Sequence, residues 1–347
     1  MDFGDGEEIR FERRGAAGII TLTRPKALNA LSLPMVQAMA RALEAWEEDN
    51  GVAAVLILGE GRAFCAGGDI ARVYDARRKG ESAVRFFADE YRLNARIERY
   101  PKPYVALIDG IVMGGGVGVS CHGSHRVMTE KALLAMPEVG IGFFPDVGGS
   151  HLLPGLPGSY GYYLALTGAR IKYGDAFAAG IATHAAPSDA MERIIADIAE
   201  GGDPDATLKA YGTAPARETD DAMLVKIAEH FSKPDLRSIL ASLEAAAGDD
   251  EFAASTLAIM RSRSPTSLAV TFRQLSSGAG LSMRDCMRME FRILKRMLEG
   301  HDFYEGIRAV LIEKDGKPVW RPETIDEVRP EDVACYFETL GDAELTF

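Results

Sequence analysis

The stretch YVALIDGIVMGGGVG, residues 104–118, holds the pattern that predicts the fold. It begins with an apolar run suited to a strand covered on both faces, and its glycines lead into the start of a helix. The same order occurs earlier, where the apolar run 52–59 is followed by the glycine-rich segment GRAFCAGGDI, residues 61–70. Strands that alternate with helices at this spacing predict an α/β core up to about residue 200.

The chain changes character near residue 200. Before it, residues 8–23 predict a β-hairpin and residues 32–49 a helix. From roughly 203 to 300, almost every segment has the apolar spacing of a helix, without a repeat or a low-complexity linker. We therefore expect two domains, a core of residues 1–200 and an α-helical C-terminal region of residues 201–347 packed on that core.

Composition and charge exclude several classes of protein. The 347 residues carry a net charge of −12, which is unfavourable for coating a nucleic acid or an anionic membrane but still permits a small anionic ligand. No apolar run is long enough to cross a bilayer, and the acidic N-terminus argues against a secretory signal or an Arg-rich transit peptide. We therefore expect a cytoplasmic chain of the bacterial type, or a mitochondrial matrix protein if the chain is a processed eukaryotic one.

The cysteines point to a reducing compartment. Cys65, Cys121, Cys286 and Cys335 are widely spaced and form no C-x-x-C motif. We expect their thiols to be reduced and to pack as small apolar groups.

The two glycine-rich segments are candidates for a ligand site. Glycine lets a backbone N–H approach a ligand closely, and two such segments side by side would aim two N–H groups at one oxygen. The alternative is that the glycines only allow tight packing between strand and helix. Neither segment matches G-x-G-x-x-G or a P-loop, so a dinucleotide or nucleoside triphosphate site is not supported.

Two acids lie in an apolar, glycine-rich stretch, PEVGIGFFPDVGG, residues 137–149. Glu138 and Asp146 flank Phe143 and Phe144, and a carboxylate is costly to bury in such surroundings without compensation. The apolar neighbours and the second acid are expected to raise at least one carboxyl pKa. As structural alternatives, backbone N–H groups satisfy Glu138, and Asp146 is the N-cap of a following helix.

Several segments, in order, resemble the crotonase (enoyl-CoA hydratase/isomerase) superfamily. They are RPKALNALS (24–32), AFCAGGDI (63–70), GGGVGVS (114–120) and MPEVGIGFFPDVGG (136–149). Residues 264–275 and 300–320 further resemble the subgroup that hydrolyses 3-hydroxyisobutyryl-CoA. The resemblance covers nearly the whole chain. It implies a spiral of ββα units with a helical C-terminal region over the acyl pocket.

The resemblance also assigns site residues. The family's two oxyanion N–H groups fall on Gly68 and Gly115, and its active-site acid falls on Glu138. The hydrolase subgroup's second acid falls on Asp146, and its further substrate-contacting acid on Glu90. Without the resemblance, Glu90 would be interpreted as part of the solvated face of a helix.

Gly118 separates two activities within the family. Hydratases of the family carry a second glutamate at this position, since hydration needs water placed at Cβ and a proton at Cα. Thioester hydrolysis needs only a stabilised carbonyl oxygen and one activated nucleophile, because a thiol leaves readily as thiolate. We therefore expect hydrolysis of 3-hydroxyisobutyryl-CoA in valine breakdown, with an enoyl-CoA hydratase or isomerase as the alternative.

The roles expected for the two acids follow from this chemistry. Glu138 is the general base for water, or attacks the thioester itself to give a mixed anhydride. Asp146 accepts a hydrogen bond from the 3-hydroxyl of the acyl group and helps to orient the water.

The expected ligand is the acyl-CoA itself. Coenzyme A enters as part of the substrate, so no separate cofactor is expected, and the histidines have no metal-ligand spacing. Lys314 and Lys317 are candidates for the phosphates of coenzyme A, with a solvated surface as the default. We expect no nucleic-acid or membrane partner. A non-enzymatic protein that keeps the crotonase fold and binds RNA is disfavoured by the acidic charge. A homo-oligomer stays open, since relatives commonly form trimers or hexamers.

Overall fold

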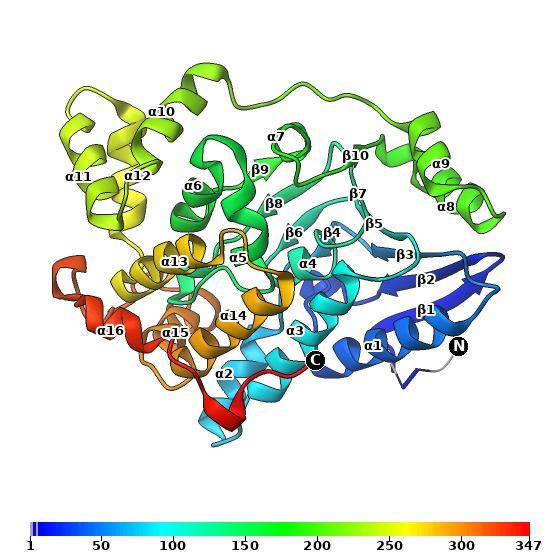
Figure 1. Cartoon of the computed structure of the whole chain (residues 1–347), viewed down its shortest axis with the longest axis horizontal. Helices are drawn as coiled ribbons and strands as arrows, with labels where there is room; N and C mark the ends of the chain where they lie inside the picture. The colour runs from blue at the N-terminus through cyan, green and yellow to red at the C-terminus, as the bar shows by residue number, and fades with distance from the viewer. Residues whose placement is uncertain (1–2, 5) are drawn as a thin grey trace. The chain divides into compact units, whose positions relative to one another are not determined.

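The structure is a computed structural model that describes residues 3–4 and 6–347. Figure 1 shows its helices and strands. The strands are β1 Ile9–Arg14, β2 Ala17–Leu22, β3 Ala54–Gly59, β4 Ala63–Cys65, β5 Tyr104–Ile108, β6 Ile111–Met113, β7 His125–Met128, β8 Leu133–Ala135, β9 Ile171–Lys172 and β10 His184–Ala185.

Helices follow the strands and dominate the later part of the chain. The helices up to residue 211 are α1 Leu33–Glu48, α2 Ile70–Arg78, α3 Val84–Glu98, α4 Gly115–Gly118, α5 Gly149–Leu152, α6 Tyr160–Thr167, α7 Tyr173–Ala178, α8 Met191–Ala199 and α9 Pro204–Tyr211. The later ones are α10 Asp221–Phe231, α11 Leu236–Ala246, α12 Glu251–Arg261, α13 Pro265–Gly278, α14 Met283–Met297, α15 Asp302–Ile307 and α16 Pro330–Cys335.

The chain divides by packing into two compact units. The first unit consists of Met1–Asp69, Asp89–Ala135 and Arg170–Glu218. The second unit consists of Ile70–Ala88, Met136–Ala169 and Thr219–Phe347. Each unit combines segments that are distant in sequence. The expected boundary after residue 200 describes the order of elements along the chain, and as a domain division it stays a proposal.

The first unit contains both sheets found in the described residues. One has the strand order β1-β2-β3-β5-β7-β10 and the other β4-β6-β8-β9. The consecutive pairs β3–β4, β5–β6 and β7–β8 each give one strand to each sheet, and a helix follows most pairs (Figure 1). This alternation confirms the predicted α/β spiral of ββα units. The predicted hairpin is also present, because β1 and β2 pair antiparallel.

Helices cover the six-stranded sheet on both faces. On one face, Ile19, Leu56 and Val105 pack with the apolar side of α8, including Ile194 and Ile198. The opposite face meets α1, where a Cβ built on Gly18 of β2 would lie 2.6 Å from the ring of Trp46. Because β2, β3 and β5 are thus covered on both sides, their sequences are continuous apolar runs without polar alternation.

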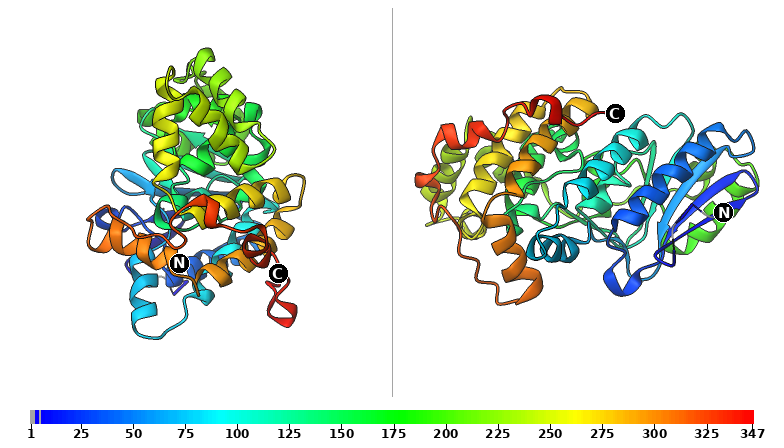
Figure 2. Two further views of the ribbon diagram at one scale, coloured as in Figure 1. Left: turned by 90° about the vertical axis from the view of Figure 1, so that its left-hand side faces the viewer. Right: turned by 90° about the horizontal axis from the view of Figure 1, so that it is seen from below.

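The second unit is built almost entirely from helices. Its helices α6 and α10–α14 pack against one another, and α16 packs on α13 (Figure 2). Helix α15 packs on α2 and on the turn Glu138–Ile141. The helical character expected from about residue 203 to 300 is confirmed. The unit also contains residues 136–150, an irregular segment with one 3₁₀ turn, Glu138–Ile141, and the short helix α5.

Candidate active site

In the first unit, two glycine turns meet at one edge of the four-stranded sheet. Gly68 follows β4 and Gly115 follows β6, and these strands are parallel neighbours. Their carboxyl ends therefore lie at the same edge of the sheet. A Cβ built on Gly115 would lie 3.1 Å from the amide nitrogen of Gly68. The geometry thus brings the two backbone amides side by side.

The residue before each of these amides has a backbone conformation that favours glycine. Gly67 has φ +119°, and Gly114 has φ 48° with ψ −121°. Residues with a side chain rarely adopt such angles. The two glycines therefore turn the following peptide groups, those of Gly68 and Gly115, to orientations that an ordinary strand end would not give.

The Gly68 N–H is left out of the local hydrogen bonding. The Leu31 N–H donates to the Gly67 carbonyl at 2.8 Å, and the Asp69 N–H donates to the Leu31 carbonyl at 2.8 Å. This parallel bridge does not use the Gly68 N–H, which has no backbone acceptor among the described residues. Gly115 is the first residue of α4, so its N–H has no intrahelical acceptor either. Both donors are available to a ligand.

Glu90 lies beside these amides. It belongs to α3, is only 1% exposed, and has its Oε1 2.6 Å from the position of a Cβ on Gly115. The sequence context of Glu90, taken without the resemblance, predicted a solvated helix face, and that prediction is wrong. The structure brings together Gly68, Gly115 and Glu90, which the sequence assigned to one site.

The remaining glycines of α4 have different surroundings. A Cβ on Gly116 would lie 2.1 Å from the Cys65 carbonyl oxygen, so the packing interpretation of the glycines holds for this position. Gly118 is buried and provides no carboxylate. Within the first unit, the acid next to the paired amides is Glu90, which comes from another element.

In the second unit, Glu138 and Asp146 are both buried. Their exposed fractions are 7% and 5%. Phe143, between them, stacks on Phe303 with ring centroids 4.4 Å apart. The Glu138 Oε2 accepts no hydrogen bond from the described residues, so backbone N–H groups do not fully satisfy this carboxyl. The N-cap of α5 is Gly148, and the alternative of Asp146 as that N-cap is wrong.

Burial and neighbouring charge act on Glu138 in the same direction. Burial raises the pKa of Glu138 well above its ordinary value, and the negative charges of Asp146 and then Glu290 raise it further. A carboxyl with a raised pKa is a stronger base once ionised, which suits proton abstraction near neutral pH. Because these acids interact, the protons are shared by the group as a whole.

Glu290 is a buried acid that the sequence analysis missed. It lies on α14 and is 0% exposed. Its carboxylate accepts hydrogen bonds from the Gly148 N–H at 2.9 Å and the Ser150 N–H at 3.0 Å. Burial raises the pKa of Glu290 to about 7, although these bonds oppose the shift. A signal was present in the sequence, since Glu290 is three residues after Met287 and four before Leu294, on the apolar face of the helix.

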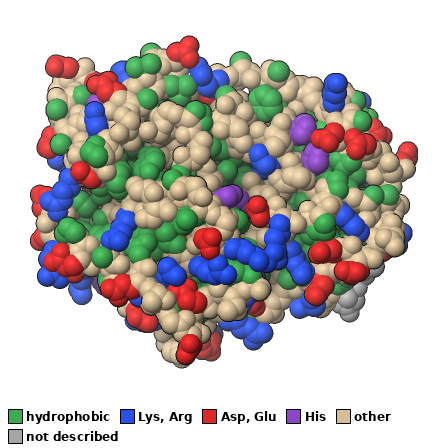
Figure 3. All heavy atoms as spheres, in the orientation of Figure 1, with side chains coloured by type: hydrophobic (Ala, Val, Ile, Leu, Met, Phe, Trp, Pro, Cys, Tyr) green, Lys and Arg blue, Asp and Glu red, His purple; other side chains and the backbone are tan. Residues whose placement is uncertain are grey.

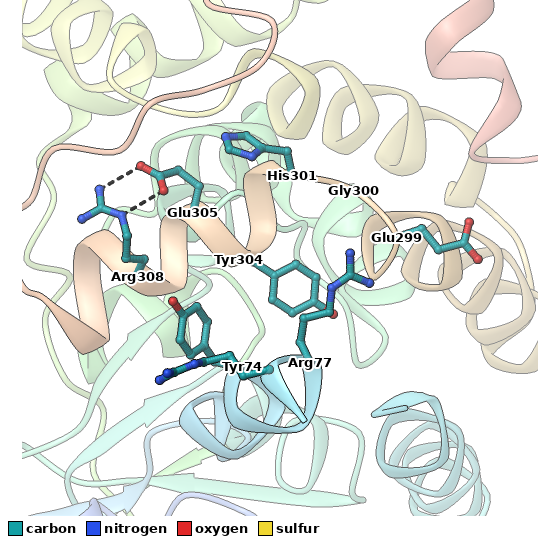
Figure 4. Close-up of a pocket in the computed structure, with 9 residues that line it drawn as sticks. Tyr74, Arg77, Glu299, Gly300, His301, Tyr304, Glu305 and Arg308 are labelled. Atoms are coloured by element: carbon teal, nitrogen blue, oxygen red, sulfur yellow. Dashed lines mark hydrogen bonds and ion pairs between the residues drawn. The ribbon is translucent and has the colours of Figure 1, made fainter. Parts of the chain in front are cut away.

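A cavity of about 460 Å³ lies between α2 and the α15 region in the second unit (Figure 4). Arg77, whose guanidinium stacks on the Tyr304 ring, lines it together with Arg78 and Arg308. Its lining also includes Glu299 and Glu305, and Arg308 pairs with three carboxylates: Glu305, Glu313 and Asp315. The lining therefore carries three arginines and two glutamates, and Glu313 and Asp315 pair with Arg308 from outside the lining. The charge of Arg308 is thus already neutralised by carboxylates, which weakens this arginine as a partner for a phosphate group.

The thiols offer no activated nucleophile. All four cysteines are free, and burial raises the pKa of Cys65 to about 12 and that of Cys121 to about 11. Cys286 is also buried. Cys335 is exposed, so the expectation that all four thiols pack as apolar groups is wrong for this residue.

No group of three or more His, Cys, Asp or Glu residues in the described part of the chain is placed to hold a metal ion. None of the described helices is both long and apolar enough to cross a membrane. Figure 3 shows acidic and basic side chains mixed over the visible face.

Comparison with known proteins supports the resemblance seen in the sequence. A family model described as enoyl-CoA hydratase/isomerase matches residues 17–337. A Rattus norvegicus protein named 3-hydroxyisobutyryl-CoA hydrolase, mitochondrial, is 44% identical over 352 residues, which cover 98% of this chain and 91% of that protein. The Homo sapiens protein of the same name is 43% identical, covering 98% of this chain and 91% of that protein.

Solved structures agree on the fold but carry other names. A carnitinyl-CoA dehydratase from Mycobacterium thermoresistibile is 44% identical, with a TM-score of 0.92 and 99% coverage of both chains. An enoyl-CoA hydratase from Rhodobacter sphaeroides is 41% identical, with a TM-score of 0.89, covering 98% of this chain and 100% of that one. From the family model, the identities and the coverage together, the chain belongs to the enoyl-CoA hydratase/isomerase family.

Proposed function

We propose that this protein is an acyl-CoA thioester hydrolase that converts 3-hydroxyisobutyryl-CoA to 3-hydroxyisobutyrate and coenzyme A, a step of valine breakdown. The observation that carries the proposal is the pair of available amides, those of Gly68 and Gly115, in a chain with Gly118 in place of a second catalytic glutamate. Two N–H donors suit a carbonyl oxygen that becomes negative. The names of the rat and human relatives support the same substrate.

The proposed chemistry assigns one task to each group. The Gly68 and Gly115 N–H groups donate to the thioester carbonyl oxygen as it gains charge. Glu138 takes a proton from water, whose oxygen forms the new bond to the carbonyl carbon, or its own carboxylate attacks that carbon to give a mixed anhydride that water then hydrolyses. In both routes the C–S bond breaks and coenzyme A leaves as thiolate. The raised pKa of Glu138 supports its role as a base.

The other two acids are proposed to recognise the substrate. Asp146 accepts a hydrogen bond from the 3-hydroxyl of the acyl group, and Glu90 contacts the substrate beside the Gly115 amide. Coenzyme A arrives with the substrate, and no further cofactor takes part. The free thiols support a reducing compartment, either a bacterial cytoplasm or a mitochondrial matrix. The acidic net charge argues against a nucleic-acid or membrane partner.

Enoyl-CoA hydratase activity is the second candidate, because two solved relatives carry hydratase or dehydratase names. Gly118 argues against it, since water addition to an enoyl group uses two carboxylates. One experiment separates the two activities. Short acyl-CoAs with and without a 3-hydroxyl, and a matching enoyl-CoA, are assayed for free thiol and for enoyl absorbance. Thiol release that is fastest with 3-hydroxyisobutyryl-CoA supports hydrolysis. Loss of enoyl absorbance without thiol release would overturn it.

A further inference from the structure

The burial of Glu290 needs a physical explanation. An ionisable side chain that is 0% exposed destabilises a fold unless its surroundings compensate. Among the described residues, the hydrogen-bond partners of its carboxylate are all donors: the Gly148 N–H, the Ser150 N–H, the Ser150 hydroxyl at 2.5 Å and, more distantly, the Gln274 amide at 3.5 Å. A set of donors without an acceptor is complementary to a carboxylate. These donors therefore favour the ionised form of Glu290, although burial outweighs them and still raises its pKa to about 7.

The backbone segment that donates these hydrogen bonds, residues 147–150, is strained. Val147 has φ 49° and Gly148 has φ 88°, so two consecutive residues lie in the left-handed region. A β-branched residue such as Val147 rarely adopts this conformation, which persists only where the surroundings impose it. Because Val147 directly follows Asp146, the strained backbone sets the direction of the Asp146 side chain.

The segment is held on both sides of Asp146. On the N-terminal side, the Gln274 side-chain amide of α13 donates to the Pro145 carbonyl at 2.7 Å. On the C-terminal side, Glu290 of α14 binds the Gly148 and Ser150 N–H groups. Two packed helices thus fix the backbone immediately before and shortly after Asp146.

We propose that Glu290 is a positioning residue, which holds Asp146 in the orientation that recognises the 3-hydroxyl of the substrate. The inference rests on the proposed function, in particular on the role of Asp146. It requires no contact between Glu290 and the substrate. The carboxylate acts through the backbone of residues 147–150, and its loss lets Val147 relax and turns Asp146 away from the hydroxyl.

The test compares two substrates in a set of variants. Thiol release is measured with 3-hydroxyisobutyryl-CoA and with isobutyryl-CoA, which lacks the hydroxyl. In Glu290→Gln, an NH₂ group replaces one of the two carboxylate oxygens. The NH₂ group cannot accept a hydrogen bond, so a backbone N–H that bonds this oxygen loses its acceptor. Since a misplacement of 1 Å can cost about a hundredfold, kcat/KM for the hydroxylated substrate is expected to fall by about that factor. The fall for isobutyryl-CoA should be much smaller, so discrimination between the substrates is lost.

Three variants complete the set. Glu290→Asp keeps the carboxylate and should recover part of the discrimination that Glu290→Gln loses. If the side chain only filled space, the shorter Asp would give no such recovery. Glu299→Gln replaces an exposed glutamate just beyond α14 and should match the wild type. Ser150→Ala removes only the hydroxyl donor. It should lower discrimination in the same direction but less, and it keeps the test decisive if Glu290→Gln does not fold.

Asp146→Asn separates failure of the inference from failure of the proposed function. If Asp146→Asn loses discrimination while folded Glu290→Gln and Ser150→Ala keep it, the positioning role is wrong and the role of Asp146 stands. If Asp146→Asn itself keeps full discrimination, the role proposed for Asp146 is wrong, and the positioning role fails with it. An equal loss on both substrates in Glu290→Gln, without recovery in Glu290→Asp, also overturns the inference.

Discussion

Adding one methyl group at Gly115 is expected to disable the paired amides without unfolding the chain. A Cβ at this position would lie 2.6 Å from Glu90 Oε1 and 3.1 Å from the Gly68 amide nitrogen. Contacts this short force Glu90 or the Gly115 backbone to move, and the methyl group enters the space where a carbonyl oxygen would meet both N–H groups. Loss of one such donor lowers kcat by about 10²–10³-fold, or about 3–4 kcal/mol of transition-state stabilisation.

The assay for Gly115→Ala is thiol release from 3-hydroxyisobutyryl-CoA, with kcat and KM determined separately. Because the amides act mainly in the transition state, kcat and kcat/KM should fall by similar factors. Gly248→Ala is the matched control, since Gly248 is exposed and a Cβ there would meet nothing within 4 Å. A folded Gly115→Ala enzyme with kcat within about threefold of the control, against the expected 10²-fold loss, would refute the reasoning.

Three further predictions concern the core and the buried acids. Trp46→Ala, in the core of the first unit, should lower the free energy of unfolding by about 3–5 kcal/mol in urea denaturation, whereas Val225→Ala, at a site 66% exposed, should change it by less than about 0.5 kcal/mol. Because Glu138 acts in its ionised form and its pKa is raised, kcat/KM should decline as the pH falls through an apparent pKa above 4.5; a rate that stays constant down to pH 4.5 would contradict this. The pKa of Glu290 is about 4.5 when unfolded and about 7 when folded, so its contribution to stability is complete below pH 4.5 and is lost as the pH rises through 7. The unfolding free energy should therefore drop by about 3 kcal/mol over this interval, and Glu290→Gln should flatten the profile.

Much of the fold was predictable because its signals are local. The continuous apolar runs of β3 and β5 predicted strands covered on both faces, and the helical spacing after residue 203 predicted the helices of the second unit. The closeness of Gly68 and Gly115 was also predictable, because parallel strands that each end in glycines bring those ends to one edge. The division into two interleaved units was not, since it depends on contacts between distant segments.

The buried acids outside the glycine-rich segments were harder to predict. Glu90 is next to Asp89, which is also an acid, and only tertiary packing decides that Glu90 is buried while Asp89 bonds Gln37 at 2.8 Å. Glu290 has the apolar spacing of a buried position, but the many charged residues of MRDCMRMEFRILKRM around it obscure that signal. Its significance follows from the backbone N–H groups of residues 148 and 150, which are some 140 positions away in the chain.

The most direct test of the proposed chemistry is the rate of thiol release from 3-hydroxyisobutyryl-CoA by Glu138→Gln. The substitution keeps the size of the side chain and removes the carboxylate that acts as base or nucleophile. The proposal predicts that a folded Glu138→Gln enzyme loses about 10²–10⁴-fold in kcat at neutral pH. Turnover close to that of the wild type would contradict it.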